Sequence, residues 1–263
     1  MPNPHGSFIW YELITSDPDG AKRFYDAVVG WNVEASSTFP NGYRMIGRSD
    51  GKMAGGVLPL TEEMKALGAR PMWLGYIHVK NVDSAADAIK ADGGQVPVAP
   101  FDIPDVGRIA MVTDPVGVPF YIMDPKPPAG QPNSESDVFD PMKPQHVRWN
   151  ELSTTDQDGA IAFFERHFGW TQEGGMPMGE MGDYKFVQAN GVGIGAIMPK
   201  PAQSPMSAWT TYFGVDDIDR GTKAITDGGG QLLYDPMEIP GGEYAVAAID
   251  PQGALFGLVG PRK

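Results

Sequence analysis

The pattern of apolar and polar positions predicts a strand and then an amphipathic helix near the start of the chain. Residues 7–15 alternate in polarity and are rich in aromatic and β-branched side chains, as is typical of a strand. Asp17 is a suitable helix N-cap, and Pro18 follows at the first helical position. Apolar side chains then recur at helical spacing until Gly30. We therefore expect a helix from Pro18 to just before Gly30.

The pattern then predicts further strands and a second helix. Strand-like runs occur at 43–46, 55–60 and 73–79. Val82, Ala85, Ala86 and Ile89 form one apolar helix face, and glycines follow at 93 and 94. Two more strands are expected at 109–113 and 118–123. Because strands outnumber helices and return as hairpins, we expect an α+β fold with helices on one face of each sheet.

The whole pattern occurs twice. Residues 8–31 align with 147–170 at an offset of 139, and later segments align at an offset of 136. A segment rich in proline and serine separates the copies and favours an extended, semi-stiff spacer. We predict a first domain over 1–124, a linker over 125–144 and a second domain over 145–263. Each domain would hold two strand–helix–strand–strand–strand units, four in all.

Composition narrows the function classes. The 263 residues carry a formal net charge of −13, which argues against nucleic acid and anionic membrane surfaces as partners. The charge favours a cationic or neutral small-molecule ligand instead. There is no cysteine, so disulfides and thiolate metal sites are excluded. The first residues show neither a basic leader nor a long apolar run, and we expect a cytoplasmic protein.

Four short motifs recur in order in both halves. They are a (T/S)xD step after the first strand, an FY or FF pair in the helix, a GW step after it, and a DPxG hairpin near the end. The first half carries them at 15–17, 24–25, 30–31 and 114–117, and the second at 154–156, 163–164, 169–170 and 250–253. The chain thereby resembles the vicinal oxygen chelate superfamily, which includes glyoxalase I, extradiol dioxygenases, fosfomycin-resistance enzymes and bleomycin-resistance proteins.

This resemblance implies two tandem domains, each a pair of βαβββ units that curls a mixed sheet into a ligand-binding cup. In the metal-using members, His and Glu from the first and last strands of the units hold a divalent ion. The matching positions here lack an imidazole or a carboxylate: Trp10, Trp149, Leu74, Thr210, Tyr121 and Gly257. We therefore expect no cofactor and no metal-ligating residues. A divalent metal remains the alternative, with His78 as its one suitably placed histidine.

Glu12 and Glu151 are the leading catalytic candidates. Each stands two residues after Trp10 or Trp149, and therefore on the same strand face. A carboxylate in an apolar, aromatic run is partly desolvated, which suits general acid–base work. The competing interpretation is a structural glutamate that closes the sheet. Tyr76 and its repeat partner Tyr212 are the candidate proton donors, or they only satisfy the sheet edge.

Other residues are candidates for ligand binding. They comprise aromatic side chains that could stack on or orient a ligand, two of them next to a basic residue, together with one histidine and one cation: Trp10, Trp149, Tyr43, Tyr184, Tyr121, His78 and Arg108. The tryptophans could equally fill the former metal space as core. Residues 101–108 and 237–244 are expected to form shaped loops that could act as lids.

Three functions are compatible with this sequence. The first is metal-independent proton transfer on a small organic molecule, of isomerase, lyase or cyclase type. The second is non-catalytic binding and sequestration of a drug-like molecule. The third is a metal-dependent lyase like glyoxalase I. Since four units in one chain can pair internally, a monomer is feasible, and a homodimer is the alternative.

Overall fold

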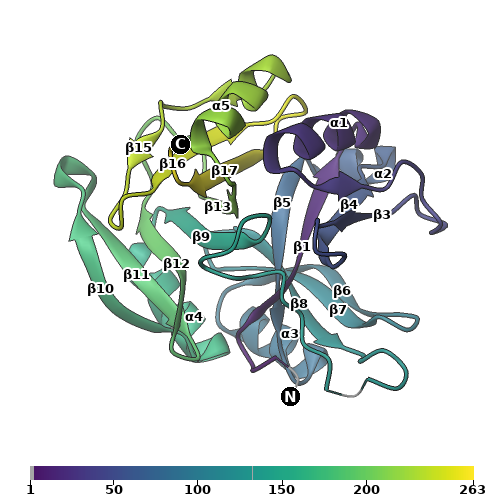
Figure 1. Cartoon of the computed structure of the whole chain (residues 1–263). Coiled ribbons are helices and arrows are strands. Elements are labelled where there is room, and N and C mark those ends of the chain that lie inside the picture. Colours follow the sequence, from purple (N-terminus) through teal and green to yellow (C-terminus); the bar gives the residue numbers. More distant parts are fainter. Residues whose placement is uncertain (1–2, 132) are drawn as a thin grey trace. The chain divides into compact units, whose positions relative to one another are not determined.

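The computed structural model describes residues 3–131 and 133–263. Within them the first half of the chain contains two groups of one strand, one helix and three strands, as the sequence pattern predicts (Figure 1). The elements are β1 (Phe8–Thr15), α1 (Pro18–Val29), β2 (Asn32–Val33), β3 (Arg44–Gly47), β4 (Met53–Pro59), α2 (Glu62–Ala66), β5 (Met72–His78), α3 (Val82–Ala91), β6 (Gln95–Ile103), β7 (Gly107–Thr113) and β8 (Pro119–Pro125).

The second half repeats this order with small changes. Its elements are β9 (Val147–Thr154), α4 (Gln157–Phe168), β10 (Thr171–Pro177), the 3-10 helix η1 (Gly179–Met181), β11 (Asp183–Ala189), β12 (Val192–Pro199), β13 (Ala208–Gly214), α5 (Ile218–Asp227), β14 (Gln231–Leu232), β15 (Met237–Glu238), β16 (Tyr244–Ile249) and β17 (Leu255–Gly260). The α+β class and the tandem repeat are therefore confirmed.

Each half of the chain builds one mixed sheet. The strand order is β2-β3-β4-β1-β5-β8-β7-β6 in the first and β10-β11-β12-β9-β13-β17-β16-β14 in the second, where β15 also pairs with β16. The outer pairs are antiparallel, whereas β1–β4, β5–β8, β9–β12 and β13–β17 are parallel. The expected curl into cups does not follow from this order, because both sheets are open and end at unpartnered edge strands.

By compactness the chain divides into two units that cut across the repeat. Unit 1 comprises residues 1–10, 75–136 and 150–209, and unit 2 comprises 11–74, 137–149 and 210–263. Each unit therefore takes one βαβββ segment from each half. In unit 2 the helices α1 and α5 pack side by side (Figure 1).

Aromatic side chains form the core of each unit. In unit 2, Trp31 packs edge-on against Phe213 with ring centroids 4.7 Å apart. In unit 1, Phe164 stacks on Trp170, also at 4.7 Å. All four side chains are buried, with at most 5% of their surface exposed. Edge-to-face and offset pairs of this kind add to the area that the rings bury.

The helix ends follow the predicted chemistry. The Asp17 carboxylate accepts a hydrogen bond from the Gly20 amide, and Asp156 does the same for Gly159. Gly30 and Gly169 end α1 and α4 in the left-handed conformation, with φ of 84° and 68°. This conformation favours glycine because it carries no Cβ. The predicted helix bounds are thus confirmed at both ends.

One prediction for the connecting segments needs correction. Residues 101–108 are the end of a β-hairpin rather than a separate loop: β6 and β7 pair with Asp102 facing Arg108, and residues 104–106 form the turn. The end of the linker is ordered, since Val138 is buried and Phe139 forms a bridge with Val147. None of the helices in residues 3–131 and 133–263 has the length and apolar character needed to cross a bilayer.

Candidate functional site

Glu151 and Tyr184 form a direct contact in unit 1. Glu151 lies half-buried on β9, and Tyr184 lies on β11, two strands away, where it is 8% exposed. The Tyr184 hydroxyl donates to Glu151 Oε2 over 2.8 Å. The strand between them carries Ala196 opposite Glu151, and this small side chain leaves room for the tyrosine ring. A predicted base and a predicted ligand-binding residue are therefore brought together.

The first half places its matching residues in the same way. Glu12 on β1 is 4% exposed, and its register partner on β4 is Gly56. A Cβ at Gly56 would lie only 1.9 Å from the Tyr43 hydroxyl oxygen, so the Tyr43 ring lies directly over this glycine. Tyr43 is thus directed across β4 as Tyr184 is directed across β12. The pattern shared by the two halves is a strand glutamate with a tyrosine that reaches over the neighbouring strand.

The tyrosines of the later strands differ between the halves. Tyr76 on β5 is the register partner of Tyr121 on β8, and the two buried rings stack 4.3 Å apart. In the second half the partner of Tyr212 is Gly257, and the Tyr212 ring covers it so closely that a Cβ would lie 2.3 Å from the ring. The Tyr212 hydroxyl lies 3.3 Å from that of Tyr234. The parallel strand pairs β5–β8 and β13–β17 therefore carry different aromatic side chains around the candidate tyrosines.

For the remaining predicted candidates, Trp10, Trp149 and His78, the structure gives the burial of the side chains but no contact that indicates a function. Trp10 on β1 and Trp149 on β9 are both half-buried. His78 closes β5, is half-buried, and keeps a buried Nδ1 for which the described residues supply no hydrogen-bond partner. Its backbone pairs with residues 6 and 7. These positions are compatible with the predicted roles but do not test them.

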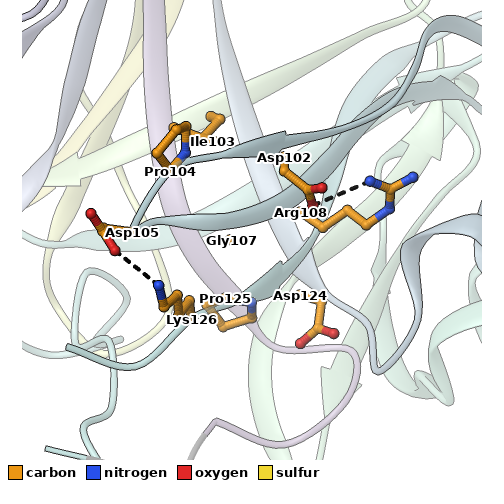
Figure 2. A pocket seen from close by; sticks show the side chains of 9 residues that line it. All are labelled: Asp102, Ile103, Pro104, Asp105, Gly107, Arg108, Asp124, Pro125 and Lys126. Atoms are coloured by element: carbon orange, nitrogen blue, oxygen red, sulfur yellow. Dashed lines mark hydrogen bonds and ion pairs between the residues drawn. The ribbon is translucent and has the colours of Figure 1, made fainter. Parts of the chain in front are cut away.

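Arg108 lies beside a shallow cavity of about 490 Å³ at the end of the β6–β7 hairpin (Figure 2). Its guanidinium binds Asp83 through two hydrogen bonds of 2.7 and 2.8 Å and also approaches Asp102 at 3.2 Å. These carboxylates raise the pKa of Arg108, and the guanidinium lowers the pKa of Asp83. Because its charge is already matched by two carboxylates, Arg108 is a weaker candidate for binding an anion than its sequence position indicates.

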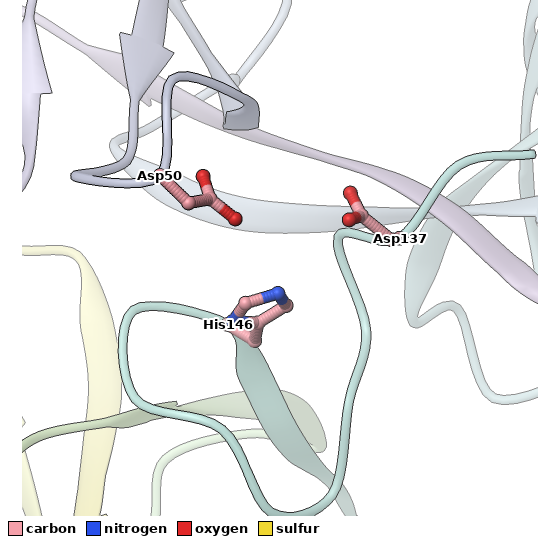
Figure 3. A group of neighbouring side chains, drawn as sticks. All are labelled: Asp50, Asp137 and His146. Atoms are coloured by element: carbon pink, nitrogen blue, oxygen red, sulfur yellow. The ribbon is translucent and has the colours of Figure 1, made fainter.

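One cluster outside the predicted site has the chemistry of a metal centre. Asp50, Asp137 and His146 place one ligand atom each within 4.8 Å of the others in unit 2 (Figure 3). His146 Nδ1 lies 2.8 Å from the Pro144 carbonyl oxygen. Since a carbonyl only accepts, Nδ1 carries the proton, and Nε2 of the neutral ring has a free lone pair. Such an arrangement is common for metal-binding histidines.

The cation of this cluster, however, is Arg48. Its Nη2 lies 2.9 and 3.0 Å from the two Asp137 oxygens and 3.0 Å from Asp50 Oδ2, and its side chain is only 1% exposed. Lys52 adds a second cation 2.8 Å from Asp137. A divalent ion would have to displace a buried guanidinium, so these residues do not fit a metal. The expectation of no metal cofactor remains a prediction.

Sequence reasoning missed one buried polar group of this fold. Asp250 of the second DPxG motif is 3% exposed and accepts a hydrogen bond of 3.0 Å from the Tyr25 hydroxyl. Burial raises the pKa of Asp250. The repeated DPxG motif could have indicated this aspartate. Its partner Tyr25 lies 225 positions away in the sequence, and no local sequence feature indicates that the two residues meet.

Comparisons with known proteins show which family the chain matches. The family model for the "Glyoxalase/Bleomycin resistance protein/Dioxygenase superfamily" matches residues 7–122 and 143–258. The Mycobacterium bovis protein named "Putative glyoxylase CFP32" is 31% identical over 255 residues, which cover 96% of this chain and 94% of that protein. The "Anthracycline biosynthesis protein DnrV" of Streptomyces peucetius is 25% identical over 276 residues, covering 97% and 93%.

Solved structures share the fold. The Mn(II)-bound glyoxalase from Novosphingobium aromaticivorans superposes with a TM-score of 0.65 at 15% identity, covering 98% of this chain and 83% of that one. The 2,2',3-trihydroxybiphenyl 1,2-dioxygenase from Sphingomonas wittichii gives 0.66 at 12% identity, covering 98% and 91%. Two tandem matches to one family model, with a relative above 30% identity over nearly the whole length, lead to one conclusion: the chain belongs to the Glyoxalase/Bleomycin resistance protein/Dioxygenase superfamily.

Proposed function

We infer that the protein acts on a small organic molecule by proton transfer at Glu151, with Tyr184 as its partner. The observation that carries this proposal is the 2.8 Å hydrogen bond from the Tyr184 hydroxyl to Glu151 Oε2. The bond fixes the orientation of the carboxylate. A glutamate held in this way, half-buried among aromatic strands, has the geometry required of a general base.

The proposed chemistry needs no change of oxidation state. Glu151 takes a proton from a carbon or hydroxyl group of the substrate, and the resulting carboxylic acid returns it at a second atom. Return to the same molecule gives an isomerisation, and loss of a leaving group after deprotonation gives a lyase reaction. The Tyr184 O–H stabilises the carboxylate in the resting state and can donate to a developing oxyanion.

The relatives guide the choice of substrate. One is named a glyoxylase and another an anthracycline biosynthesis protein. Planar anthracycline intermediates and small oxo compounds are therefore the first compounds to test. The net charge of −13 favours cationic or neutral members of each set. A monomer or a homodimer is compatible with this proposal.

The test follows proton exchange directly. Candidate compounds are incubated with the protein in D₂O, and deuterium incorporation is followed by NMR. We expect Glu151→Gln to slow exchange by about 10²- to 10⁴-fold, the usual contribution of a general base. Tyr184→Phe removes only the hydroxyl and should cause a smaller loss. Exchange at the wild-type rate in Glu151→Gln, with the fold intact by circular dichroism, contradicts the proposal.

Sequestration without turnover is the second candidate function. The half-buried Trp10 and Trp149 and the net charge of −13 favour it, because accessible aromatic faces bind planar or cationic ligands. A thermal-shift screen separates the two functions. Stabilisation by a planar cationic compound, with no deuterium exchange and no product, supports sequestration. Exchange that depends on Glu151 supports catalysis.

A further inference from the structure

Phe186 lies beside the proposed base, on the same face of the sheet. Glu151 on β9 is the register partner of Ala196 on β12, and Ala196 in turn is the register partner of Phe186 on β11. Paired residues of neighbouring strands present their side chains on one face. Because neighbouring strands lie about 4.8 Å apart, the backbones of Glu151 and Phe186 are about 10 Å apart, with the small Ala196 between them.

The two residues are also connected through Tyr184. The rings of Tyr184 and Phe186 meet edge-on, with centroids 5.9 Å apart and an interplanar angle of 80°. The Tyr184 hydroxyl donates to Glu151. Tyr184 is buried, whereas Glu151 and Phe186 each keep part of their surface exposed. We call Glu151, Tyr184, Phe186 and Ala196 the Glu151 patch: a partly exposed carboxylate and a partly exposed ring on either side of a buried phenol.

Gly174 on β10 leaves part of the Phe186 ring without a covering side chain. A Cβ at Gly174 would lie 3.5 Å from this ring, at ordinary van der Waals distance. A larger residue there would therefore cover that part of the ring. Gly174 has a φ of 75°, in the left-handed region that favours glycine. The backbone conformation of β10 thus helps to keep the ring accessible.

Glu151 is the one charged residue of this patch. Lys185 stands between Tyr184 and Phe186 on β11, so it points to the opposite face, where it pairs with Asp158 of α4 over 2.6 Å. Arg148, three positions before Glu151 on β9, also has the opposite orientation. Among the described residues of β9, β11 and β12, no lysine or arginine therefore shares the face of Glu151. An anionic ligand would be repelled by the carboxylate without a compensating cation on these strands.

The first half of the chain has no ring at the matching place. Glu12, Gly56 and Met45 repeat the register of the three strands, so Met45 stands where the second half has Phe186. Met45 is also half-buried. Methionine is flexible and offers no flat face. An aromatic surface in this register is therefore particular to the half of the chain that carries Glu151.

We propose that Phe186 is a specificity-determining residue on which a planar, uncharged aromatic substrate stacks beside Glu151. This inference rests on the proposed function, because it places the substrate next to the proposed base. Offset or edge-on contact with Phe186 holds the substrate ring. Since Phe186, Ala196 and Glu151 lie in one row across the strands, the ring system extends over Ala196 toward the carboxylate. The carboxylate in turn disfavours substrates that carry an anionic group.

Three matched probes test the substrate class. 2-Naphthol is planar and uncharged, 2-naphthoate carries a carboxylate on the same rings, and trans-2-decalol keeps the hydroxyl but has no aromatic face. Each is titrated into the ¹⁵N-labelled protein, with the backbone amides of Glu151, Phe186 and Ala196 as reporters. We expect 2-naphthol to bind with a Kd of about 1 mM or lower. 2-Naphthoate should bind about tenfold more weakly and trans-2-decalol about three- to tenfold more weakly.

The Phe186→Met variant tests the ring itself. Methionine is the residue at the matching position 45, so this variant should fold. It should weaken 2-naphthol binding about three- to tenfold and leave trans-2-decalol binding nearly unchanged, because only the aromatic probe loses a ring partner. Phe101→Met is the matched control. It makes the same exchange at an exposed ring on the edge strand β6 of the other sheet and should bind all three probes as the wild type does.

The Glu151→Gln variant tests the charge. Removing the negative charge should bring 2-naphthoate binding to within about threefold of 2-naphthol binding. An undiminished preference for 2-naphthol in this variant, or equal binding of the two probes to the wild type, overturns the electrostatic part of the proposal.

These titrations measure binding without turnover, so their outcome is separate from that of the exchange experiment. Wild-type deuterium exchange in Glu151→Gln overturns the proposed function, whereas the contribution of the Phe186 ring to ligand binding is still measured. Equal losses of 2-naphthol and trans-2-decalol binding in Phe186→Met overturn the role of the ring, even where exchange depends on Glu151. The absence of reporter shifts up to about 1 mM 2-naphthol overturns it too.

Discussion

Trp73, Tyr25 and Asp250 form a buried chain of hydrogen bonds in unit 2. The Trp73 indole N–H donates to the Tyr25 hydroxyl over 2.8 Å, and that hydroxyl donates to Asp250 over 3.0 Å. Burial and the Asp250 charge raise the pKa of Tyr25. One phenolic oxygen therefore satisfies both a buried donor and a buried acceptor, which would otherwise each cost free energy.

Unit 1 has no hydroxyl group at the position that corresponds to Tyr25. Phe164 stands at the position of Tyr25, with Trp209 and Asp114 in place of Trp73 and Asp250. Phe164 and Trp209 keep the same edge-on contact, with ring centroids 5.5 Å apart against 5.3 Å for Tyr25 and Trp73. The Trp209 N–H and the second Asp114 oxygen are both buried without a hydrogen-bond partner among the described residues.

We predict that Phe164→Tyr stabilises the protein. The added hydroxyl would accept from Trp209 and donate to Asp114, and two satisfied groups should raise the free energy of unfolding by about 1 to 2 kcal/mol. Urea denaturation followed by tryptophan fluorescence measures the change. The reverse variant, Tyr25→Phe, is the matched control and should lower stability by about 1 to 3 kcal/mol. A destabilised or unchanged Phe164→Tyr would contradict this account of the two unpartnered groups.

At the scale of elements, Arg48 joins the turn between β3 and β4 to the end of the linker. Besides its carboxylate partners, it donates to the backbone carbonyls of Met53 and Asp137 over 3.0 and 3.2 Å. The hydrogen bonds from Arg48 hold the pKa of Asp50 at about 2, below its usual 3.8. The linker end is thus attached by a charge network that composition alone could not locate.

This attachment predicts a particular pH dependence. A carboxylate whose folded-state pKa is lowered stabilises the fold above its unfolded pKa, and that contribution is lost as pH falls through the folded pKa. For Asp50 the window runs from about pH 4 to pH 2. The stability difference between wild type and Asp50→Asn should therefore shrink as pH falls through this window.

Thermal unfolding at a series of pH values measures the Asp50 effect. Asp87→Asn is the matched control, because Asp87 is exposed on α3 and has no ion pair with the described residues. It controls for the loss of one exposed carboxylate charge. A difference for Asp50→Asn that stays constant from pH 5 to about pH 2 would mean that Arg48 does not stabilise the Asp50 carboxylate.

At the scale of the whole molecule, the two halves are unequal in their glutamate positions. Glu12 is 4% exposed, whereas Glu151 is half-buried and is held by Tyr184. A base must meet its substrate, so the more accessible glutamate is better placed to act. Under the proposed function, Glu151→Gln should reduce deuterium exchange at least tenfold more than Glu12→Gln, as roughly expected when a direct base is lost. Equal losses would assign the reaction to both halves.

The expectation of no metal cofactor is a prediction at this scale. The strand positions at which the family resemblance implies metal ligands carry Trp10, Leu74 and Tyr121, and the Asp50 cluster already contains Arg48. We predict that metal analysis of the purified protein finds less than stoichiometric Zn, Ni, Mn or Fe. Treatment with EDTA should leave deuterium exchange and melting temperature unchanged. A stoichiometric metal whose removal abolishes exchange would restore the metal-dependent alternative.

The sequence by itself determined the elements and their duplication. Helix caps such as Asp17 and Gly30 act through neighbouring atoms, and strand alternation is a local pattern. Both can therefore be predicted from a stretch of about ten residues. The repeat fixed the number of units because each copy preserves the same local signals. The glutamates were found for the same reason, since Glu12 and Glu151 share one face with their tryptophans in both copies.

The tertiary structure alone decided which distant residues meet. Tyr184 reaches Glu151 because β12 lies between their strands and carries a small residue there, and Tyr25 reaches Asp250 because α1 packs in unit 2 with the second half of the chain. Neither contact can be predicted from the local periodicity of the sequence. Two ion pairs are also non-local: Arg108 binds Asp83, and Arg48 binds Asp137, and the linear pattern could not assign either carboxylate.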